Sequence, residues 1–316
     1  MKLVTYASAK QSRLGVVQDG LVVDVAAAFA WMAEGRITDA KLAAAVQAMR
    51  KPGRPPEDMR ELLSWGESYR KALGVVATAA GGTGKKTPKG LLVPLRSARL
   101  RAPLRHPWKI VCIGLNYADH AREQGLEPPT RPILFLKSHN TICGPGDPIR
   151  LPPNSTQVDY EAEFAVIIGK RGRRIPESDA HKYIAGYTIL QDVSARDLQY
   201  GDRQWFRGKS CDTFAPTGPW IVTADELPDI NNLRISLTLN GQTMQDSSTG
   251  SLIFKAPFLI SYLSQSVTWE PGDLLATGTP GGVGRFRNPQ VFLKPGDTVS
   301  VSVEGIGTLT NPVVGP

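Results

Sequence analysis

The sequence contains few cysteines, and they lie far apart. Cys112, Cys143 and Cys211 are the three among 316 residues, and no two of them form a closely spaced pair. Neither a disulfide framework nor a zinc site of paired cysteines is therefore indicated. We expect reduced, mostly buried thiols in a chain long enough to build a sizeable hydrophobic core.

Long apolar runs are also missing. No stretch reaches the roughly 18 consecutive apolar residues that suggest a membrane span, and residues 1–6 alternate like a strand and do not resemble a secretory signal. The 41% hydrophobic and 21% charged fractions are those of an ordinary soluble protein. These features predict a cytoplasmic, globular protein with no membrane partner.

Acidic residues are scarce in the first third of the chain. Residues 1–105 hold 18 Lys and Arg against 8 Asp and Glu, whereas residues 106–316 hold 19 against 21. The whole net charge of +8 thus belongs to the first part, which supports a boundary near residue 105. A nucleic-acid-binding protein with an inactive enzymatic domain is a remote alternative, since the basic residues are scattered without interleaved aromatic ones. We expect no nucleic acid partner.

The pattern of secondary structure changes at the same boundary. Residues 2–24 read as short strands with a hairpin turn at Asp19-Gly20, and residues 25–50 and 57–73 have helical composition. Residues 79–89, rich in glycine, are expected to form a flexible link. A small α/β N-terminal domain over residues 1–105 is therefore predicted.

Short β-branched runs separated by Gly and Pro dominate residues 106–316. They include Ile110–Ile113, Ile133–Leu136, Phe164–Ile168, Tyr187–Leu190, Trp220–Val222, Ile235–Leu239, Leu274–Thr277 and Thr298–Val303. This density of strands predicts a β-rich α+β domain of twisted, antiparallel sheets.

Three carboxylates form a candidate metal site. Glu161 and Glu163 begin an apolar strand, whose period-two alternation places both on one face, and Asp192 ends another apolar run. The three converge if the two strands are neighbours. Oxygen ligands favour Mg²⁺, Mn²⁺ or Ca²⁺ over zinc and leave positions at which a 2-oxo acid can chelate. The alternative is that both glutamates lie on the solvated face of an edge strand.

These carboxylates lie within a fixed series of motifs. The series consists of Gly114–Glu123, Phe135–Lys137, Val158–Glu163, Gly186–Gln199, Gly208–Phe214 and Pro271–Gly284. Over residues 106–312 it closely resembles the fumarylacetoacetate hydrolase family. The resemblance implies a mixed β-sandwich roll, a homodimer, a bound Mg²⁺, Mn²⁺ or Ca²⁺, and a small 2-oxo or diketo acid as substrate.

Roles for individual residues are implied by the same resemblance. The metal ligands fall on Glu161, Glu163 and Asp192, the catalytic dyad on His120 and Glu123, and the active-site lysine on Lys209. The substrate contacts fall on Gln199 and Thr279. Because three carboxylates outweigh one divalent ion, an anionic substrate needs further cations, and Lys137 is expected to assist Lys209.

The dyad suggests hydrolysis. His120 and Glu123 are three residues apart in a stretch that Asn116 could cap as a short helix, so Glu123 can orient an imidazole that takes a proton from water. The leading prediction is therefore cleavage of a carbon–carbon bond in an acylpyruvate or 1,3-diketo acid, with the metal stabilising the enolate. Decarboxylation of oxaloacetate and isomerisation of an unsaturated 2-oxo dioic acid are the alternatives.

Two loops complete the expected site. Thr277–Gly284 is predicted to grip a carboxylate through its amides and hydroxyl, and it lacks the Gly-Lys-Ser/Thr ending of a nucleotide-binding loop. The segment Arg122–Arg131, with one glycine and two adjacent prolines, suits a mobile lid that carries the dyad.

Overall fold

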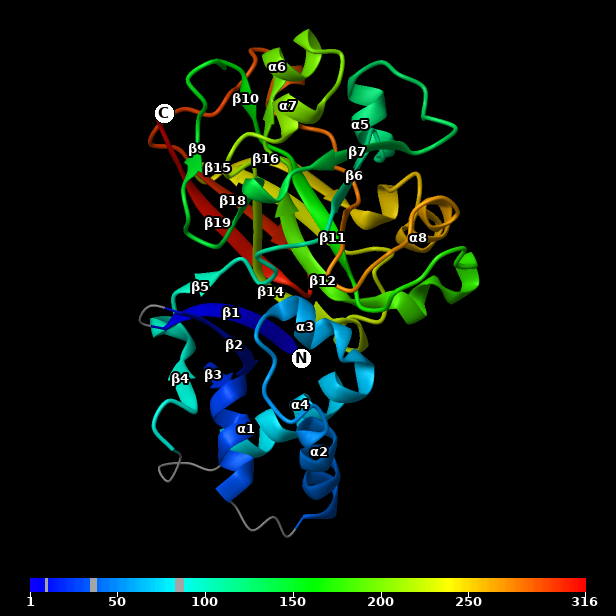
Figure 1. Cartoon of the computed structure of the whole chain (residues 1–316). Helices are drawn as coiled ribbons and strands as arrows, with labels where there is room; N and C mark the ends of the chain where they lie inside the picture. The colour runs from blue at the N-terminus through cyan, green and yellow to red at the C-terminus, as the bar shows by residue number, and fades with distance from the viewer. Residues whose placement is uncertain (9–10, 35–38, 83–87) are drawn as a thin grey trace.

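The computed structural model describes residues 1–8, 11–34, 39–82 and 88–316. Figure 1 shows two connected parts, with the N-terminal strands and helices at one end and the strand-rich remainder at the other. Within the described residues, no helix is both long and apolar enough to cross a bilayer.

The N-terminal part is a β-meander covered by helices. Its strands are β1 (Lys2–Ser8), β2 (Gln11–Gln18), β3 (Leu21–Asp24), β4 (Leu92–Pro94) and β5 (Leu100–Arg101), and its helices are α1 (Val25–Glu34), α2 (Ala40–Arg50), α3 (Met59–Ser64) and α4 (Gly66–Gly81). The expected hairpin at Asp19-Gly20 is confirmed: both residues have the positive φ that this tight turn requires.

The helical expectations need two corrections. The expected helix over 57–73 is two helices, α3 and α4, separated at Gly66, whose φ of 84° interrupts the helical path. Helix α4 then continues to Gly81, so the first residues of the expected link are helical because Val76, Ala77 and Ala80 bury an apolar face. Residues 83–87 of that link lie outside the described part of the chain.

The remainder of the chain is strand-rich. Its strands are β6 (Ile110–Gly114), β7 (Ile133–Lys137), β8 (Ile142–Cys143), β9 (Ile149–Arg150), β10 (Val158–Asp159), β11 (Ala162–Ile168), β12 (Ile184–Gln191), β13 (Ser194–Ala195), β14 (Ala215–Thr223), β15 (Arg234–Leu239), β16 (Gln242–Ser248), β17 (Leu274–Ala276), β18 (Thr298–Val303) and β19 (Gly307–Val314). Its α-helices are α5 (Ala118–Glu123), α6 (Arg196–Gly201), α7 (Phe206–Lys209) and α8 (Ala256–Ser264). The β-rich α+β prediction is confirmed.

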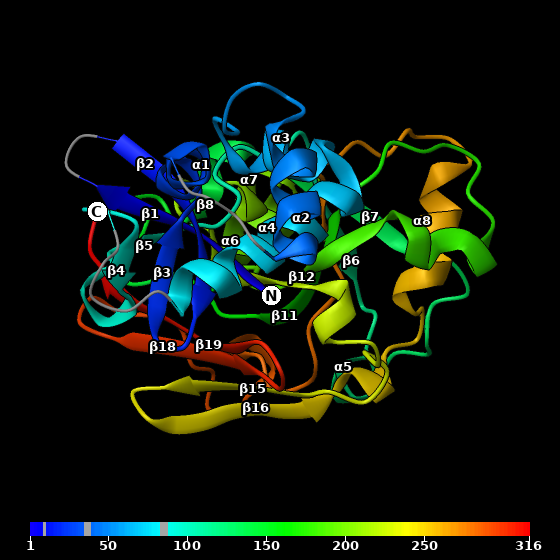
Figure 2. The same cartoon turned by 90° about the horizontal axis from the view of Figure 1, so that it is seen from below.

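Two sheets pack against each other. The larger has the order β4-β3-β2-β1-β14-β12-β11-β17-β6-β7, and the smaller has the order β16-β15-β18-β19-β9. Figure 2 shows β15, β16, β18 and β19 as a layer of their own. Most neighbouring strands are antiparallel, as expected, but β6 with β17, β8 with β14 and β9 with β19 are parallel, so both sheets are mixed.

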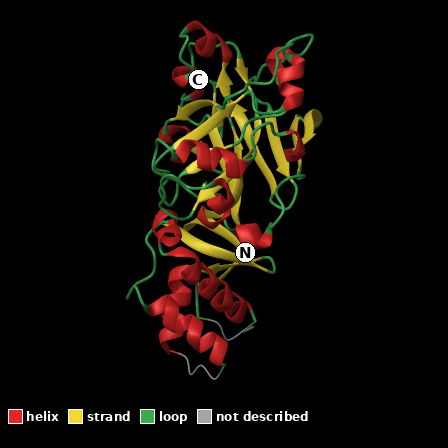
Figure 3. Cartoon of the chain, turned by 90° about the vertical axis from the view of Figure 1, so that its right-hand side faces the viewer, coloured by secondary structure: helices red, strands yellow, loops and turns green. Residues whose placement is uncertain are grey.

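The larger sheet runs across the boundary expected near residue 105. Strand β1 pairs with β14 through Lys2 opposite Val222 and Leu3 opposite Ile221. Figure 3 shows the helices of the N-terminal part at one end of these strands. The two parts of the chain therefore share one hydrogen-bonded sheet.

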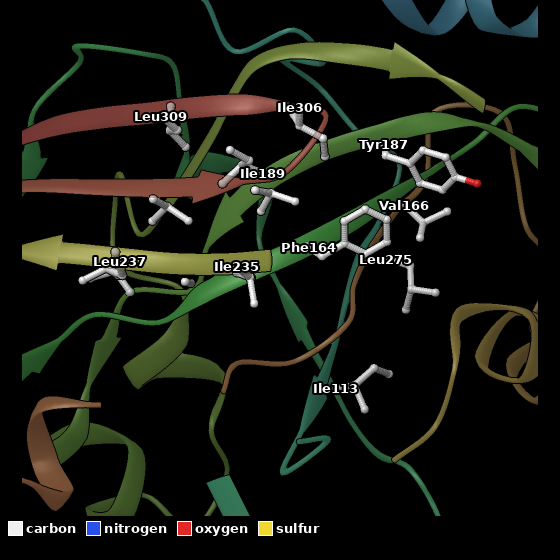
Figure 4. Close-up of a cluster of buried hydrophobic side chains, with 14 of the residues drawn as sticks. Ile113, Phe164, Val166, Tyr187, Ile189, Ile235, Leu237, Leu275, Ile306 and Leu309 are labelled. Carbon is white, nitrogen blue, oxygen red and sulfur yellow. The ribbon is translucent and has the colours of Figure 1, made fainter. Parts of the chain in front are cut away.

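Strand β11 is buried on both faces, which fixes its orientation. Figure 4 shows Phe164 between Val166 of the same strand and Ile235 of the smaller sheet, and all three belong to a buried cluster that also contains Leu237. Ala165 and Ile167 instead join the apolar cluster that includes the N-terminal helices. Because burying one large apolar side chain contributes about 1.5–3 kcal/mol, this double burial strongly resists any slip in register.

Candidate metal and proton-transfer site

The three predicted carboxylates meet where two strands end side by side. Glu161 directly precedes β11, Glu163 lies within it, and Asp192 directly follows the neighbouring strand β12. The backbone amide of Asp192 donates to the Glu161 carbonyl at 2.9 Å. One carboxylate oxygen from each residue lies within 4.8 Å of the others. The convergence expected from the period-two pattern is thus present.

All three carboxylates are buried, with exposed fractions of 5%, 1% and 0% for Glu161, Glu163 and Asp192. The alternative of a solvated edge-strand face is therefore wrong. Strand β11 has neighbours on both sides, because β12 and β17 flank it in the larger sheet.

Two lysines contact the cluster. Lys209 Nζ donates to Glu161 Oε2 at 2.8 Å and to Asp192 Oδ2 at 2.6 Å. Lys137 Nζ donates to Asp192 Oδ1 at 2.6 Å and to the Val193 carbonyl at 3.1 Å. Burial alone would lower the pKa of Lys209, but Asp192 and Glu161 raise it, so this lysine keeps its charge.

A third cation, Arg196, was not among the residues singled out from the sequence. Its Nη2 atom lies 2.7 Å from Glu161 Oε1 and 2.8 Å from Asp159 Oδ2, and the side chain is 3% exposed. Burial alone would raise the pKa of Glu161, but Lys209 and Arg196 outweigh it and hold that pKa below its usual range. The signal available in the sequence was a basic residue four positions after Asp192 within a family motif.

Glu163 has no such cation partner among the described residues. Its Oε2 atom accepts one backbone bond, from Gly278 at 2.8 Å. Burial raises the pKa of Glu163 well above its usual value, and the negative charges of Asp192 and Glu161 raise it further. Buried carboxylate oxygens whose negative charge is not fully balanced suit a hard divalent cation. Glu161, Glu163 and Asp192 are the residues that would hold it.

The expected dyad is formed on helix α5. His120 Nδ1 lies 2.6 Å from Glu123 Oε1, and Glu123 Oε2 accepts from the Gly282 amide at 2.7 Å. Because a carboxylate only accepts, this contact places a hydrogen on Nδ1. Glu123 is thus held by the loop that follows β17, and it orients the imidazole.

The expected capping role of Asn116 is wrong. The N-cap of α5 is Tyr117, and its side chain makes no capping bond. Asn116 instead donates to the Thr277 carbonyl at 2.7 Å and accepts from the Phe254 amide at 2.8 Å. Completely buried, this asparagine satisfies loop backbone groups that would otherwise lack partners.

Hydrogen bonds hold the loop 277–284 beside the carboxylate cluster. Gly278 has a φ of 104°, and a Cβ at this position would lie 2.8 Å from the Cβ of Asn116, so only glycine fits without a shift. The Gln245 side chain donates to Thr279 Oγ1 at 2.9 Å and to the Pro280 carbonyl at 2.8 Å. In this arrangement one loop amide binds Glu163, and Thr279 is held in position.

Several of these groups line one cavity of about 240 Å³, whereas Asp192 and Glu123 are not part of its lining. Its polar lining includes His120, Gln124, Glu161, Glu163, Arg196, Gln199, Lys209 and Thr279, and its apolar lining includes Ile113, Leu126, Ile133, Phe135, Trp205 and Phe286. Gln199 is buried and accepts from Arg196 Nη1 at 3.1 Å. Lys137 is not part of this lining and reaches the carboxylates through Asp192. The structure therefore brings the other expected substrate contacts together and leaves Lys137 outside the cavity.

The segment 122–131 begins on a helix that is anchored at several points. Besides the Glu123 contact, Asp119 accepts from the Ser247 hydroxyl at 2.6 Å and from the Gly281 amide at 3.3 Å. Leu126 lines the cavity and is half exposed. Movement of this segment as a lid stays a prediction.

Comparison with known proteins gives consistent matches. The family model described as fumarylacetoacetate (FAA) hydrolase C-terminal matches residues 109–314. The chain is 49% identical to the mitochondrial oxaloacetate tautomerase Fahd2a of Rattus norvegicus over 71% of its length and 72% of that protein. It is 47% identical to the mitochondrial oxaloacetate tautomerase FAHD2A of Bos taurus over 82% of its length and 80% of that protein.

A solved structure with a different reaction is also similar. Maleylpyruvate hydrolase from Sphingobium sp. SYK-6 has a TM-score of 0.75 and 29% identity, and the match covers both chains completely.

One expectation from the sequence is overturned by these comparisons. Both oxaloacetate tautomerases are named as mitochondrial proteins, which contradicts the cytoplasmic location expected above.

Proposed function

The chain belongs to the fumarylacetoacetate hydrolase family, and on that premise we propose that it interconverts the keto and enol forms of oxaloacetate or a closely related 2-oxo dicarboxylic acid. Mg²⁺ or Mn²⁺ is the proposed cofactor, with Ca²⁺ as a further possibility, because every protein ligand is a carboxylate oxygen. The relatives named as oxaloacetate tautomerases supply the substrate class.

The observation that carries this proposal is the placement of an oriented base beside a carboxylate cluster. His120 lines the same cavity as Glu161 and Glu163, and its Nδ1 is turned toward Glu123. Transfer of a proton from the carbon next to a carbonyl requires a general base in a fixed orientation and a binding site for the 2-oxo acid. His120 and the carboxylate cluster would provide these two features.

Tautomerisation needs only the movement of a proton. The His120 Nε2 atom takes a proton from C3 of the keto acid, the C–H electron pair forms the C2–C3 double bond, and the keto oxygen becomes an enolate. Protonation of that oxygen by the imidazolium or by solvent gives the enol, and the reverse sequence regenerates the ketone. A bound divalent cation supplies a Lewis acid for the keto oxygen.

The remaining polar groups are proposed to bind the acid. Lys209 and Arg196 provide positive charge inside the cavity, and Gln199 and Thr279 provide neutral hydrogen-bonding groups. Because Lys209 and Arg196 already neutralise Glu161, they also limit the negative charge that a dianionic substrate meets on entry.

Hydrolysis of a carbon–carbon bond, the leading prediction from the sequence, is the second candidate function. It is favoured by the similarity to maleylpyruvate hydrolase, because the same His120–Glu123 dyad could activate a water molecule in place of a C–H bond. Oxaloacetate decarboxylation is a third reaction that passes through the same enolate.

Two assays separate these reactions. The purified protein with Mg²⁺ or Mn²⁺ is mixed with the enol form of oxaloacetate. The rate at which the enol absorbance is lost is compared with the rate in the presence of the metal ion without the protein. With oxaloacetate we expect accelerated loss of the enol absorbance without release of CO₂. In a separate incubation of acylpyruvates in ¹⁸O-labelled water, we expect no labelled acid product. Pyruvate formation would identify a decarboxylase, and ¹⁸O-labelled acid products would identify a hydrolase.

The His120→Ala variant tests the base. Since general acid–base groups contribute about 100- to 10,000-fold to rates, we expect a loss of at least about 100-fold in kcat with unchanged binding of Mn²⁺. Full turnover by this variant would refute the assigned base.

A further inference from the structure

The residue after the dyad, Gln124, contacts the other nitrogen of the histidine. Its side-chain Nε2 lies 2.9 Å from His120 Nε2, and Gln124 lines the cavity. The histidine is 7% exposed, so few other partners can reach its ring. Both ring nitrogens are therefore occupied by side chains of one short segment.

The chemistry of the two partners fixes the direction of these bonds. The carboxylate of Glu123 can only accept, so Nδ1 carries the hydrogen and the neutral ring keeps its lone pair on Nε2. An amide N–H of Gln124 then donates into that lone pair. This lone pair is also the one that must take a proton from a substrate or water.

We propose that Gln124 is a positioning residue that donates to the lone pair of His120 Nε2, in the Nδ1–H tautomer that Glu123 sets, and covers this basic nitrogen until a substrate displaces the amide. The catalytic consequence rests on the proposed function, whereas the tautomer and the contact do not. An amide serves both charge states of the ring: it donates through N–H to the neutral imidazole, and after a half-turn it accepts through C=O from the imidazolium. Neither an apolar nor an anionic side chain can do both.

Two variants of the same length separate these roles. Gln124→Met removes the donor and keeps the bulk, whereas Gln124→Glu keeps the shape but only accepts. The exposed Gln265, which bonds to Ser261 and is not part of the cavity lining, gives the matched control Gln265→Glu. Other charged groups around the ring are Glu123 on α5 and Glu161, Glu163, Arg196 and Lys209 in the cavity lining, and all of them are unchanged in these variants.

The direct measurement is ¹⁵N NMR of the histidine rings in the complete, metal-free protein at alkaline pH. The sequence has four histidines, so His120→Ala assigns the signals. We expect a protonated Nδ1 and a hydrogen-bonded, unprotonated Nε2. The Nε2 signal should move downfield in Gln124→Met, and both nitrogens should be protonated in Gln124→Glu at neutral pH. The Gln265→Glu spectrum should match the wild type.

Kinetics supply the second readout. Protonation of the base in Gln124→Glu should lower kcat at neutral pH by about 100-fold or more, with little change in KM and with recovery as the pH rises. Gln124→Met should keep most of kcat.

Several results would overturn the inference: a hydrogen on Nε2 of the wild type, an unchanged Nε2 signal in Gln124→Met, or an unprotonated ring in Gln124→Glu. If the spectra agree but the wild type does not act on oxaloacetate, the proposed substrate fails and the role of Gln124 stands.

Discussion

Arg196 joins two carboxylates that would otherwise repel each other at close range. It contacts Asp159 and Glu161, and Asp159 in turn accepts from the Gly284 amide at 2.8 Å. One guanidinium therefore links the carboxylate cluster to the loop that holds Glu123. Arginine suits this position because its planar fork stays charged when buried.

Replacement of Arg196 by glutamine should destabilise the protein strongly. Removing one partner of a buried ion pair leaves an uncompensated charge and typically costs about 3–5 kcal/mol. Denaturant unfolding of Arg196→Gln measures the loss. Arg234→Gln, which breaks an exposed pair with Asp246, is the matched control and should change stability little. Equal effects of the two substitutions would contradict the structural role of Arg196.

Glu163 should make the metal-free protein less stable as the pH rises. Burial, Asp192 and Glu161 raise its pKa in the folded protein. The stability that this residue contributes is therefore fully present below about pH 4.3, the usual pKa of an unfolded glutamate, and is lost as the pH rises through the folded pKa.

Thermal unfolding between pH 4 and 9 measures this dependence. Glu163→Gln should lack the decline, whereas Glu304→Gln, at an exposed position, should retain it. Addition of Mn²⁺ should stabilise the wild type at the upper end of the range. A wild type whose stability tracks that of Glu163→Gln at every pH would contradict the assignment.

Elements with strong periodicity were predicted well. The run Phe164–Ile168 is confirmed as part of β11, and Glu161 and Glu163 continue its alternation onto the face of Ala165. That local pattern predicted only that Glu161 and Glu163 share a face, and the family resemblance was needed to group them with Asp192. The pairing of β11 with β12 could not be derived locally, because register depends on residues distant in sequence.

Short and loop elements were predicted less well. Asparagine is a residue type that often caps helices, but Asn116 forms hydrogen bonds to Phe254 and Thr277, which are distant in sequence, and these bonds determine its conformation. Arg196 and Gln124 were missed because their importance lies in contacts that chain spacing alone does not reveal. The break between α3 and α4 depends on one glycine with positive φ.

The loop 277–284 offers a test at the scale of an element. Gly278→Ala should displace the loop, since the new methyl would meet Asn116, and misplacement by about 1 Å can cost about 100-fold in rate. Gly241→Ala is the matched control, because its φ is also positive, at 83°, but nothing lies within 4 Å of the added Cβ. Equal activity of the two variants would contradict a positioning role for this loop.

The whole molecule leaves one edge of its larger sheet apolar. Strand β7 ends the sheet, and Ile133, Leu134 and Leu136 on it are 38%, 40% and 51% exposed. An unpaired edge strand offers its backbone groups to another chain, and a contiguous exposed apolar patch marks an interaction surface. This edge is therefore the surface on which we expect a homodimer to form.

Sedimentation of a charged β7 variant tests the dimer. Replacing both Leu134 and Leu136 by arginine should convert the dimer to a monomer, whereas Val267→Arg, at an exposed apolar residue elsewhere, should leave it intact. If the dimer persists in the β7 variant, the interface lies on another surface. A monomeric wild type would exclude the dimer altogether.

The central claim is that Glu161, Glu163 and Asp192 hold one divalent cation at which a 2-oxo acid can chelate. Its most direct test is anomalous diffraction from crystals grown with Mn²⁺ and oxalate. We predict one strong peak bonded by a carboxylate oxygen of each of the three residues and by two oxalate oxygens. Absence of a peak at these carboxylates, with Lys209 still bridging Glu161 and Asp192, would contradict the account.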